Sequence, residues 1–184
     1  MTSTLYVDNL IEKTSGNGVH IPGHTIQSAY GVLRPGRDFS NDTSTTSTSY
    51  TNLVGNVSGT VLGASLNGVS ATSFLLFTYS CGLVRNGNGT DRSNMVYNIW
   101  ESNDQKYVAN STNWTGSNDP YAAGHWNTTD HTGMVSWTFI AEPGFFSGNC
   151  NFQMRVKSGN GNLFYYHWHG NRVGHFLSVQ EIAQ

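Results

Sequence analysis

The sequence predicts an all-β protein, a jelly-roll-like antiparallel β-sandwich, and three observations lead to this fold class. Only 11% of the 184 residues are charged, less than half the usual share of about 25%. The polar residues are mainly Ser, Thr, Asn and Gly, which favour strands and turns over helices. Apolar and polar residues alternate in short runs separated by Gly and Asn, and no run of ten residues has helical periodicity.

The alternation is clearest in two runs of the predicted sandwich domain, residues 41–184. Apolar side chains occupy every second position of Gly133–Glu142 and of Asn151–Val156, the period expected of strands with one buried face. The Gly159–Asn162 tract predicts a hairpin after the second run, because Gly and Asn tolerate positive φ. The eight candidate strands are Asn52–Val57, Thr60–Ala64, Ser73–Cys81, Met95–Ser102, Gly133–Glu142, Asn151–Val156, Leu163–His169 and Gly174–Ile182.

Residues 1–40 are predicted to form an extended N-terminal segment. Short apolar runs are interrupted by turns there, and they offer too little apolar surface to fold alone. We therefore expect the segment to pack on its own domain, on other copies of the chain or on a docking partner. The polar tract Asp38–Ser49 predicts a linker or long loop. The apolar side chains expected to dock or to join three chains are Leu5, Tyr6, Val7, Leu10, Ile11, Val19, Ile21 and Ile26.

Charge and hydropathy exclude several classes of partner. Nine Lys and Arg residues, a net charge of −2 and no basic run argue against a nucleic-acid binder. The longest apolar stretch, Phe74–Phe77, is far shorter than the roughly 20 residues that span a bilayer.

The start, Met1–Tyr6, lacks the features of a secretory signal. Cys81 and Cys150 are expected to be separate buried thiols, with a disulfide as the alternative.

The sequence predicts no enzyme and no catalytic residue. It contains no nucleophile elbow, phosphate-binding loop or zinc-protease motif. The 11 acidic residues are scattered, so that their spacing implies no catalytic pair. A hydrolytic carboxylate pair that assembles only in space remains the alternative.

Two histidines form the sharpest local feature. His167 and His169 lie two positions apart in a candidate strand, so their side chains are expected on one face. A similar His-x-His arrangement occurs in trimeric phage tail-fibre tips. Two imidazoles from each of three chains on a threefold axis would give an octahedral site for a transition metal. We expect both histidines to be hydrogen-bonded or solvated at a strand end and the protein to have no cofactor, and the transition-metal site is the alternative.

Aromatic residues in residues 101–131 are candidate sugar contacts. This region lacks long apolar alternation, and we expect short strands and surface excursions there. Flat rings beside short polar side chains suit carbohydrate, because rings meet C–H faces and the polar groups meet hydroxyls. Cores and subunit interfaces use the same residues. The candidate glycan contacts are Trp114, Tyr121 and Trp126.

Three segments carry a resemblance to a known family. Leu5–Gln27, with its Ser-Gly-Asn-Gly-Val-His-Ile-Pro-Gly-His centre, resembles the N-terminal segment of virion proteins of tailed phages, particularly marine cyanophages. Thr43–Leu53 resembles the approach to the first strand of those proteins, and Leu177–Gln184 is similar to their last strand. The sequence departs from the pattern at Ser70–Phe74 and throughout residues 101–131.

The resemblance implies a non-enzymatic virion structural protein, a tail fibre or a tail- or capsid-associated fibre. It implies a homotrimer with a jelly-roll domain like those of the complement C1q and tumour-necrosis-factor families. The N-terminal segment would dock on other virion proteins, and the C-terminal domain would face outward, where it could meet a host-surface glycan. Such a protein would be assembled in the host cytoplasm and reside in the virion. A stand-alone, lectin-like carbohydrate-binding module is the alternative function.

Overall fold

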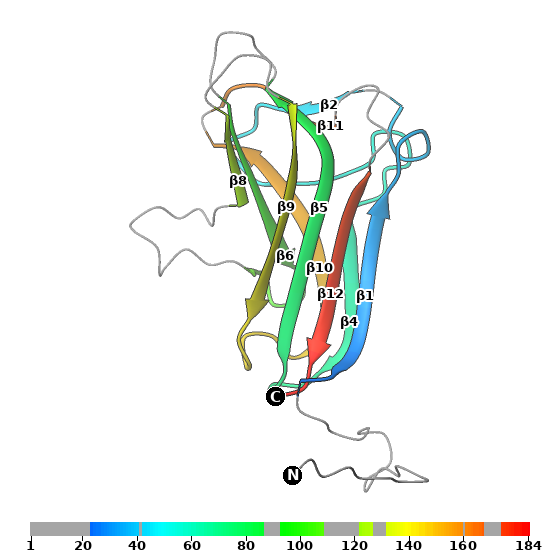
Figure 1. Ribbon diagram of the computed structural model, residues 1–184, viewed down its shortest axis with the longest axis vertical. Coiled ribbons are helices and arrows are strands. Elements are labelled where there is room, and N and C mark those ends of the chain that lie inside the picture. Colours follow the sequence, from blue (N-terminus) through cyan, green and yellow to red (C-terminus); the bar gives the residue numbers. More distant parts are fainter. Residues whose placement is uncertain are drawn as a thin grey trace, which may run out of the picture.

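The protein is an antiparallel β-sandwich of two packed sheets (Figure 1). No helix long and apolar enough to cross a membrane occurs among the residues that the structure describes. The computed structural model describes residues 23–40, 42–86, 93–108, 122–126, 132–159, 161–167 and 174–184.

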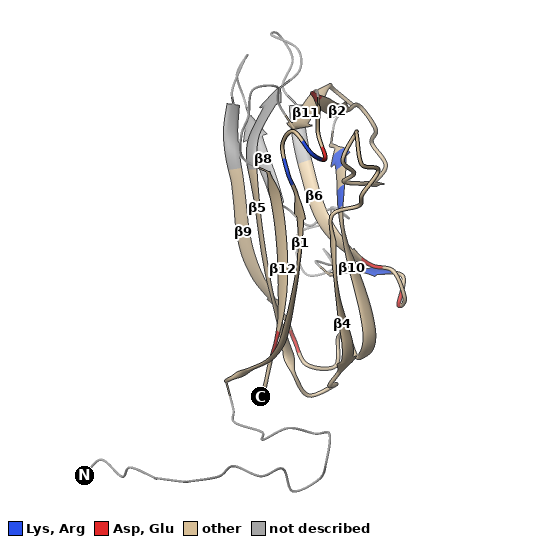
Figure 2. Ribbon diagram, turned by 90° about the vertical axis from the view of Figure 1, so that its right-hand side faces the viewer, with Lys and Arg blue, Asp and Glu red and all other residues tan. Residues whose placement is uncertain are grey.

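Within the described residues each sheet has six strands, and the pairings between these strands are antiparallel. The first sheet contains β1 (Thr25–Leu33), β2 (Thr43–Thr45), β5 (Phe74–Asn86), β9 (Thr132–Ala141), β11 (Phe164–His167) and β12 (His175–Ile182). The second contains β3 (Thr51–Asn52), β4 (Gly63–Val69), β6 (Ser93–Glu101), β7 (Lys106–Tyr107), β8 (Ala122–Trp126) and β10 (Gly148–Ser158). Figure 2 shows the two layers side by side.

The long strands from β4 onward alternate between the sheets. β4, β6 and β10 lie in the second sheet, and β5, β9 and β12 lie in the first. Chain crossings of this kind are typical of jelly-roll sandwiches. The predicted fold class, an all-β jelly-roll-like sandwich, is confirmed.

Alternate residues of the central strands fill the space between the sheets. Phe77 of β5 and Phe152 of β10 are fully buried, and their rings meet edge to face across the sandwich with centroids 4.9 Å apart. In β12, Leu177 and Val179 are fully buried, whereas Ser178 between them is not. In these strands, every second residue therefore faces the core, and the residues between them form the outer faces of the two sheets.

The pairing of β1 corrects the domain boundary expected at residue 40. β1 runs along β12 from Thr25 to Leu33, and both Leu33 and Phe39 lie in the core. Residues 23–40 are thus part of the sandwich, because they supply an edge strand and core side chains. The other expected docking residues, in residues 1–22, lie outside the described part of the chain: Leu5, Tyr6, Val7, Leu10, Ile11, Val19 and Ile21.

A close approach of β1 to β4 explains one glycine. A Cβ atom at Gly31 of β1 would collide with the carbonyl oxygen of Gly63 in β4. Only glycine avoids this collision. The two sheets therefore come together along the β1 edge, which fixes β1 against the sandwich.

Three local predictions are corrected. The strand expected over Asn52–Val57 is reduced to β3, because the chain turns at residues 56–58. The linker expected over Asp38–Ser49 contains β2. The hairpin expected around Gly159–Asn162 does not form, because β10 and β11 pair within different sheets.

Cys81 and Cys150 are separate, buried thiols. They lie on β5 and β10, in different sheets. Burial raises the pKa of each thiol to about 11. Neither is therefore an activated nucleophile, which would need a lowered pKa and access to solvent.

Candidate functional site

The outer face of the second sheet is set by the alternation of β10. Arg155 and Lys157 point outward and are partly exposed, whereas the apolar residues between and before them are buried. Arg155 is paired with Asn52 of β3 on one side and with Asn98 of β6 on the other. Directly paired residues share a face of the sheet, so Asn52 and Arg155 belong to one surface, whereas Asn98, on the same side of the sheet, is only 2% exposed and is not part of it.

Three aromatic rings lie on the same surface. The Trp100 ring of β6 meets the Tyr107 ring of β7 edge to face, with centroids 4.7 Å apart. The Tyr50 ring, just before β3, lies 4.8 Å from the Tyr107 ring. All three side chains are partly exposed. We call the following group the Arg155 platform: Tyr50, Asn52, Trp100, Tyr107, Arg155 and Lys157.

Arg155 ties three strands of the platform together. Its guanidinium carbon lies 4.3 Å from the centroid of the Trp100 ring, a cation–π contact. Its Nε donates a hydrogen bond to Asn52 Oδ1 at 3.0 Å, and its Nη1 donates to the Tyr107 hydroxyl at 3.3 Å. These bonds use two of the five N–H donors of a guanidinium. The side chain is fixed in place by neutral partners.

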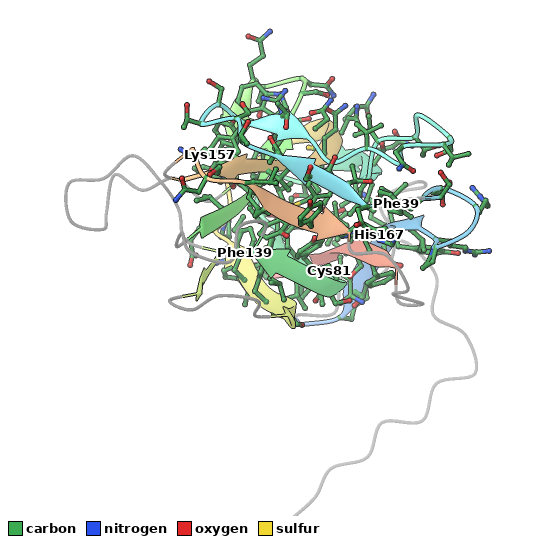
Figure 3. All side chains as sticks on the ribbon, turned by 90° about the horizontal axis from the view of Figure 1, so that it is seen from above. Phe39, Cys81, Phe139, Lys157 and His167 are labelled. Atoms are coloured by element: carbon green, nitrogen blue, oxygen red, sulfur yellow. The ribbon has the colours of Figure 1, made fainter. Side chains whose placement is uncertain are left out.

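Lys157 adds a second positive charge to the platform. It lies two residues after Arg155 on β10, so both side chains project from the same face. Its Nζ lies 4.8 Å from the centroid of the Tyr50 ring. Figure 3 shows Lys157 at the rim of the sandwich, well away from His167.

The outer face of the first sheet has a different composition. Three rows of cross-strand partners run over β1, β12, β5 and β9, and they contain hydroxyl, amide and apolar side chains without a charge. We call this surface the hydroxyl face. Its members are Ser28, Tyr30, Val32, Phe176, Ser178, Gln180, Leu76, Thr78, Ser80, Ser136, Thr138 and Ile140.

Large apolar side chains are exposed on and beside the hydroxyl face. Tyr30 is 72% exposed, Ile140 55% and Phe176 36%. The Tyr30 and Phe176 rings stack with centroids 6.2 Å apart. Ile26, predicted from the sequence to dock on a partner, is 45% exposed on the same edge strand. In Figure 2 the described parts of β1, β12, β5 and β9 are almost entirely free of blue and red.

The predicted glycan contacts fall outside what the structure describes. Trp114 and Tyr121 lie outside the described residues. Trp126 is in β8, where its backbone pairs with Ser93, but its side chain is not described. The short strands expected in residues 101–131 are present as β7 and β8.

The structure of His167 argues against the alternative of a metal site on a threefold axis. A bulge in the pairing of β11 with β2 falls between Tyr165 and His167, so the strict alternation ends there. The His167 side chain is only 4% exposed and stacks on Phe39 with ring centroids 4.1 Å apart (Figure 3). It cannot reach an axis between chains. His169 lies outside the described residues, which contain no cluster of three or more metal-ligating side chains.

His167 instead belongs to a buried aromatic cluster. Its ring lies 6.0 Å from that of His175, and the Nδ1 atom of His175 is hydrogen-bonded to the Tyr79 hydroxyl at 3.0 Å. Burial lowers the pKa of His175 to about 3 and lowers the pKa of His167. Both rings are therefore neutral at physiological pH.

Two buried carboxylates have structural partners. Glu101 accepts hydrogen bonds from the backbone N–H groups of Asn151, at 2.7 Å, and of Asp104. Glu181 accepts a bond from the backbone N–H of Ser70 at 2.8 Å and one from the Gln27 amide at 2.6 Å. Glu101 is 0% exposed and Glu181 1% exposed. Neither is accessible to a substrate, so they do not form the hydrolytic pair considered above.

Sequence reasoning missed the three rings of the platform. The alternation in β10 did place Arg155 and Lys157 on one polar face. Trp100 directly follows Ile99 in β6, and Ile99 is fully buried. Because successive side chains of a strand point to opposite faces, the sequence signals that Trp100 points outward. The convergence of Tyr50 and Tyr107 depends on which strands are neighbours, and alternation within one strand does not contain that information.

Comparisons with known proteins give two distant structural likenesses. No family model and no curated protein matches the sequence. One similar structure is the N-terminal part, CBM22-1 and GH10 modules, of endo-1,4-β-D-xylanase 10B from Clostridium thermocellum complexed with xylohexaose (TM-score 0.33, 10% identity). The likeness covers 90% of this chain and 29% of that chain.

The other similar structure is the CBM22-1 xylan-binding domain of Xyn10C from Paenibacillus barcinonensis (TM-score 0.30, 7% identity). The likeness covers 89% of this chain and 97% of that domain. TM-scores of this size are too low to transfer a fold or a ligand to this protein.

Proposed function

We propose that the protein is a non-enzymatic carbohydrate-binding module and that the Arg155 platform is its binding face. One observation carries the proposal: Arg155 is clamped by Asn52, Trp100 and Tyr107 in a half-exposed surface of rings and polar groups. Aromatic faces bind the C–H faces of sugars, and fixed polar groups bind their hydroxyls. Because the platform is held by three strands, little ordering is needed on binding.

A non-enzymatic role fits the chemistry of the described residues. The buried carboxylates Glu101 and Glu181 are engaged by backbone and amide donors. The thiols of Cys81 and Cys150 have raised pKa values. These groups stabilise the fold and do not supply an acid, a base or a nucleophile to a substrate.

Glycan-array screening of the full chain, followed by calorimetry on the best ligand, tests this proposal. Trp100→Ala removes the largest ring of the platform and should weaken binding at least about tenfold. Tyr30→Ala removes an exposed ring from the hydroxyl face and serves as the control, with unchanged affinity. Glycan affinity that is unchanged in Trp100→Ala, or that is lost in Tyr30→Ala, would contradict the assignment of the Arg155 platform as the binding face.

A second candidate function is that of a self-assembling virion subunit, as the N-terminal resemblance implies. The observation that favours it is the uncharged hydroxyl face, with Tyr30 and Ile140 largely exposed. Four strands about 4.8 Å apart and about eight residues long span on the order of 500 Å². Two such faces reach the roughly 1,000 Å² that a specific interface needs. A face without charges is matched best by another uncharged face, so the occupant is a second copy of the chain.

Analytical ultracentrifugation of the full chain tests this second candidate. The resemblance implies a trimer, whereas two hydroxyl faces in direct contact would give a dimer. Either assembly would support self-association, and a monomer at micromolar concentration would contradict it. Deletion of residues 1–22 should then prevent incorporation into phage particles, whereas the sandwich should stay folded. Particles that still take up the truncated protein would show that this segment is not the docking element.

A further inference from the structure

We infer that the carbohydrate recognised by the Arg155 platform is acidic, bearing carboxylate or sulfate groups along its chain. This inference rests on the proposed function and names its ligand class. The observation behind it is that the platform combines two cations with three rings on a surface whose other members are neutral. A neutral sugar gains less from two positive charges than an acidic sugar does, because charge-assisted hydrogen bonds are the stronger ones.

The two cations are spaced along one strand. Arg155 and Lys157 are next-but-one neighbours on β10, so their backbones are about 7 Å apart. Each lies beside a ring, Arg155 over Trp100 and Lys157 over Tyr50. A sugar on the rings would therefore have a positive charge within reach at two successive points.

No carboxylate shares this face among the described residues of β3, β4, β6, β7 and β10. Glu101 is paired with Lys106 in the β6–β7 register and points away from the platform, into the buried side. Asp104, in the turn before β7, has Lys106 Nζ at 3.0 Å as its own counter-ion. The positive charge of the platform is local, since the whole chain has a net charge of −2.

The state of Arg155 favours an anionic partner. Its hydrogen bonds go to a neutral amide and a neutral phenol, so its charge is not neutralised by them. A guanidinium held in this way binds carboxylate or sulfate oxygens with two parallel N–H donors, and such charge-assisted bonds are stronger than neutral ones. Since the side chain is already oriented, less rotamer freedom is lost on binding.

Calorimetry on the full chain with four probes tests the inference. The probes are an oligogalacturonate hexamer, a sulfated heparin-derived hexasaccharide, neutral xylohexaose and a single-stranded DNA decamer. At low salt, at least one acidic saccharide should bind about tenfold or more tightly than xylohexaose. The difference should shrink in about 0.5 M NaCl, because salt screens exposed charges. Whichever acidic probe binds better identifies carboxylate or sulfate as the recognised group.

Two variants locate the effect. Arg155→Gln and Lys157→Gln should each weaken binding of the preferred acidic saccharide about threefold to tenfold, and each should weaken it by a larger factor than it weakens xylohexaose binding. Arg37→Gln, a change at a side chain that is 67% exposed and outside the platform, is the matched control and should leave both affinities unchanged.

The outcomes separate this inference from the proposed function. Equal affinity for acidic and neutral saccharides, with both lost in Trp100→Ala, would overturn the acidic ligand and leave the carbohydrate module standing. Tightest binding to the DNA decamer would overturn the inference, because aromatic and cationic faces also bind single strands. No binding to any saccharide would overturn the proposed function as well.

Discussion

The two outer faces of the sandwich share one core and have opposite chemistry. The hydroxyl face is uncharged and presents Tyr30, Phe176 and Ile140 among Ser and Thr. The Arg155 platform presents rings together with two cations. The residues that face inward are mainly apolar in both sheets. Outward positions contribute little to the core, so each face is free to specialise for a different partner.

β10 and β12 show this division within single strands. In β10, Met154 and Val156 are fully buried and Arg155 lies between them on the outside. In β12, Val179 is fully buried and its neighbour Ser178 lies outside. Both strands place apolar residues in the shared core, and their outward residues differ. The outward residues therefore give each sheet its own surface.

The largest effect is expected from removing a core ring that both faces depend on. Phe152→Ala deletes a fully buried ring that packs against Phe77 and Phe146. The resulting cavity should lower the free energy of unfolding by about 3–5 kcal/mol. Urea denaturation followed by tryptophan fluorescence measures this loss. The platform and the hydroxyl face should both lose function at temperatures where the variant unfolds.

Phe176→Ala is the matched control on the hydroxyl face. Its ring is 36% exposed, so the stability loss should stay below about 1.5 kcal/mol. Equal losses in the two variants would contradict the division between the inner and outer positions of the strands.

Acid should destabilise the sandwich through the buried histidines. An unfolded chain takes up a proton on His175 near the ordinary pKa of about 6.5, whereas burial lowers the folded pKa to about 3. Protons therefore favour the unfolded state as the pH falls from about 6.5 towards 3, and His167 acts in the same direction. Between pH 7.5 and pH 5 the free energy of unfolding should fall by about 2 kcal/mol on account of His175.

Denaturation curves of the wild type and His175→Asn at both pH values measure this contribution. The variant should be less stable at pH 7.5 but lose less stability on acidification, because asparagine does not titrate. An identical pH dependence in the two proteins would mean that other groups cause the acid effect.

The sequence predicted the layers better than it predicted the surfaces. Alternation within a strand is local, so the inward set of β5, β9, β10 and β12 and the fold class were predictable. The membership of strands in sheets depends on long-range pairing, which is why the β10–β11 hairpin was predicted wrongly and β1 was left out of the sandwich. The burial of His167 was unpredictable for a related reason: a bulge in β11 ended the alternation, and the partner, Phe39, is far away in the sequence.

Substitutions on the hydroxyl face should weaken the association between copies of the chain, whereas substitutions on the Arg155 platform should not. The double variant Tyr30→Ser with Ile140→Ser replaces two largely exposed side chains and should weaken association between copies about tenfold to thirtyfold, or about 1.4–2 kcal/mol. Folding stability should change by less than about 0.5 kcal/mol per site. Sedimentation velocity over a range of concentrations measures the association, and calorimetry on the same samples should show unchanged saccharide affinity.

The converse pattern would break the comparison between the two faces. If the double variant kept its oligomeric state, or if Trp100→Ala lost it, the hydroxyl face would not be the contact between copies. Loss of association in Trp100→Ala would in addition make the Arg155 platform an interface and not a binding site for sugar.

The smallest effect is expected from one hydroxyl group on the platform. Tyr107→Phe keeps the ring that packs on Tyr50 and Trp100 but removes the oxygen that accepts a hydrogen bond from Arg155 Nη1. Arg155 would still be held by Asn52 and by the Trp100 ring. Loss of one charge-assisted bond on a partly exposed surface should therefore weaken acidic-saccharide binding only about twofold to fivefold, or roughly 0.5–1 kcal/mol. Xylohexaose affinity and the melting temperature should stay the same. A variant that bound acidic saccharide more tightly would show that the Tyr107 hydroxyl competes with the ligand for the guanidinium and does not orient it.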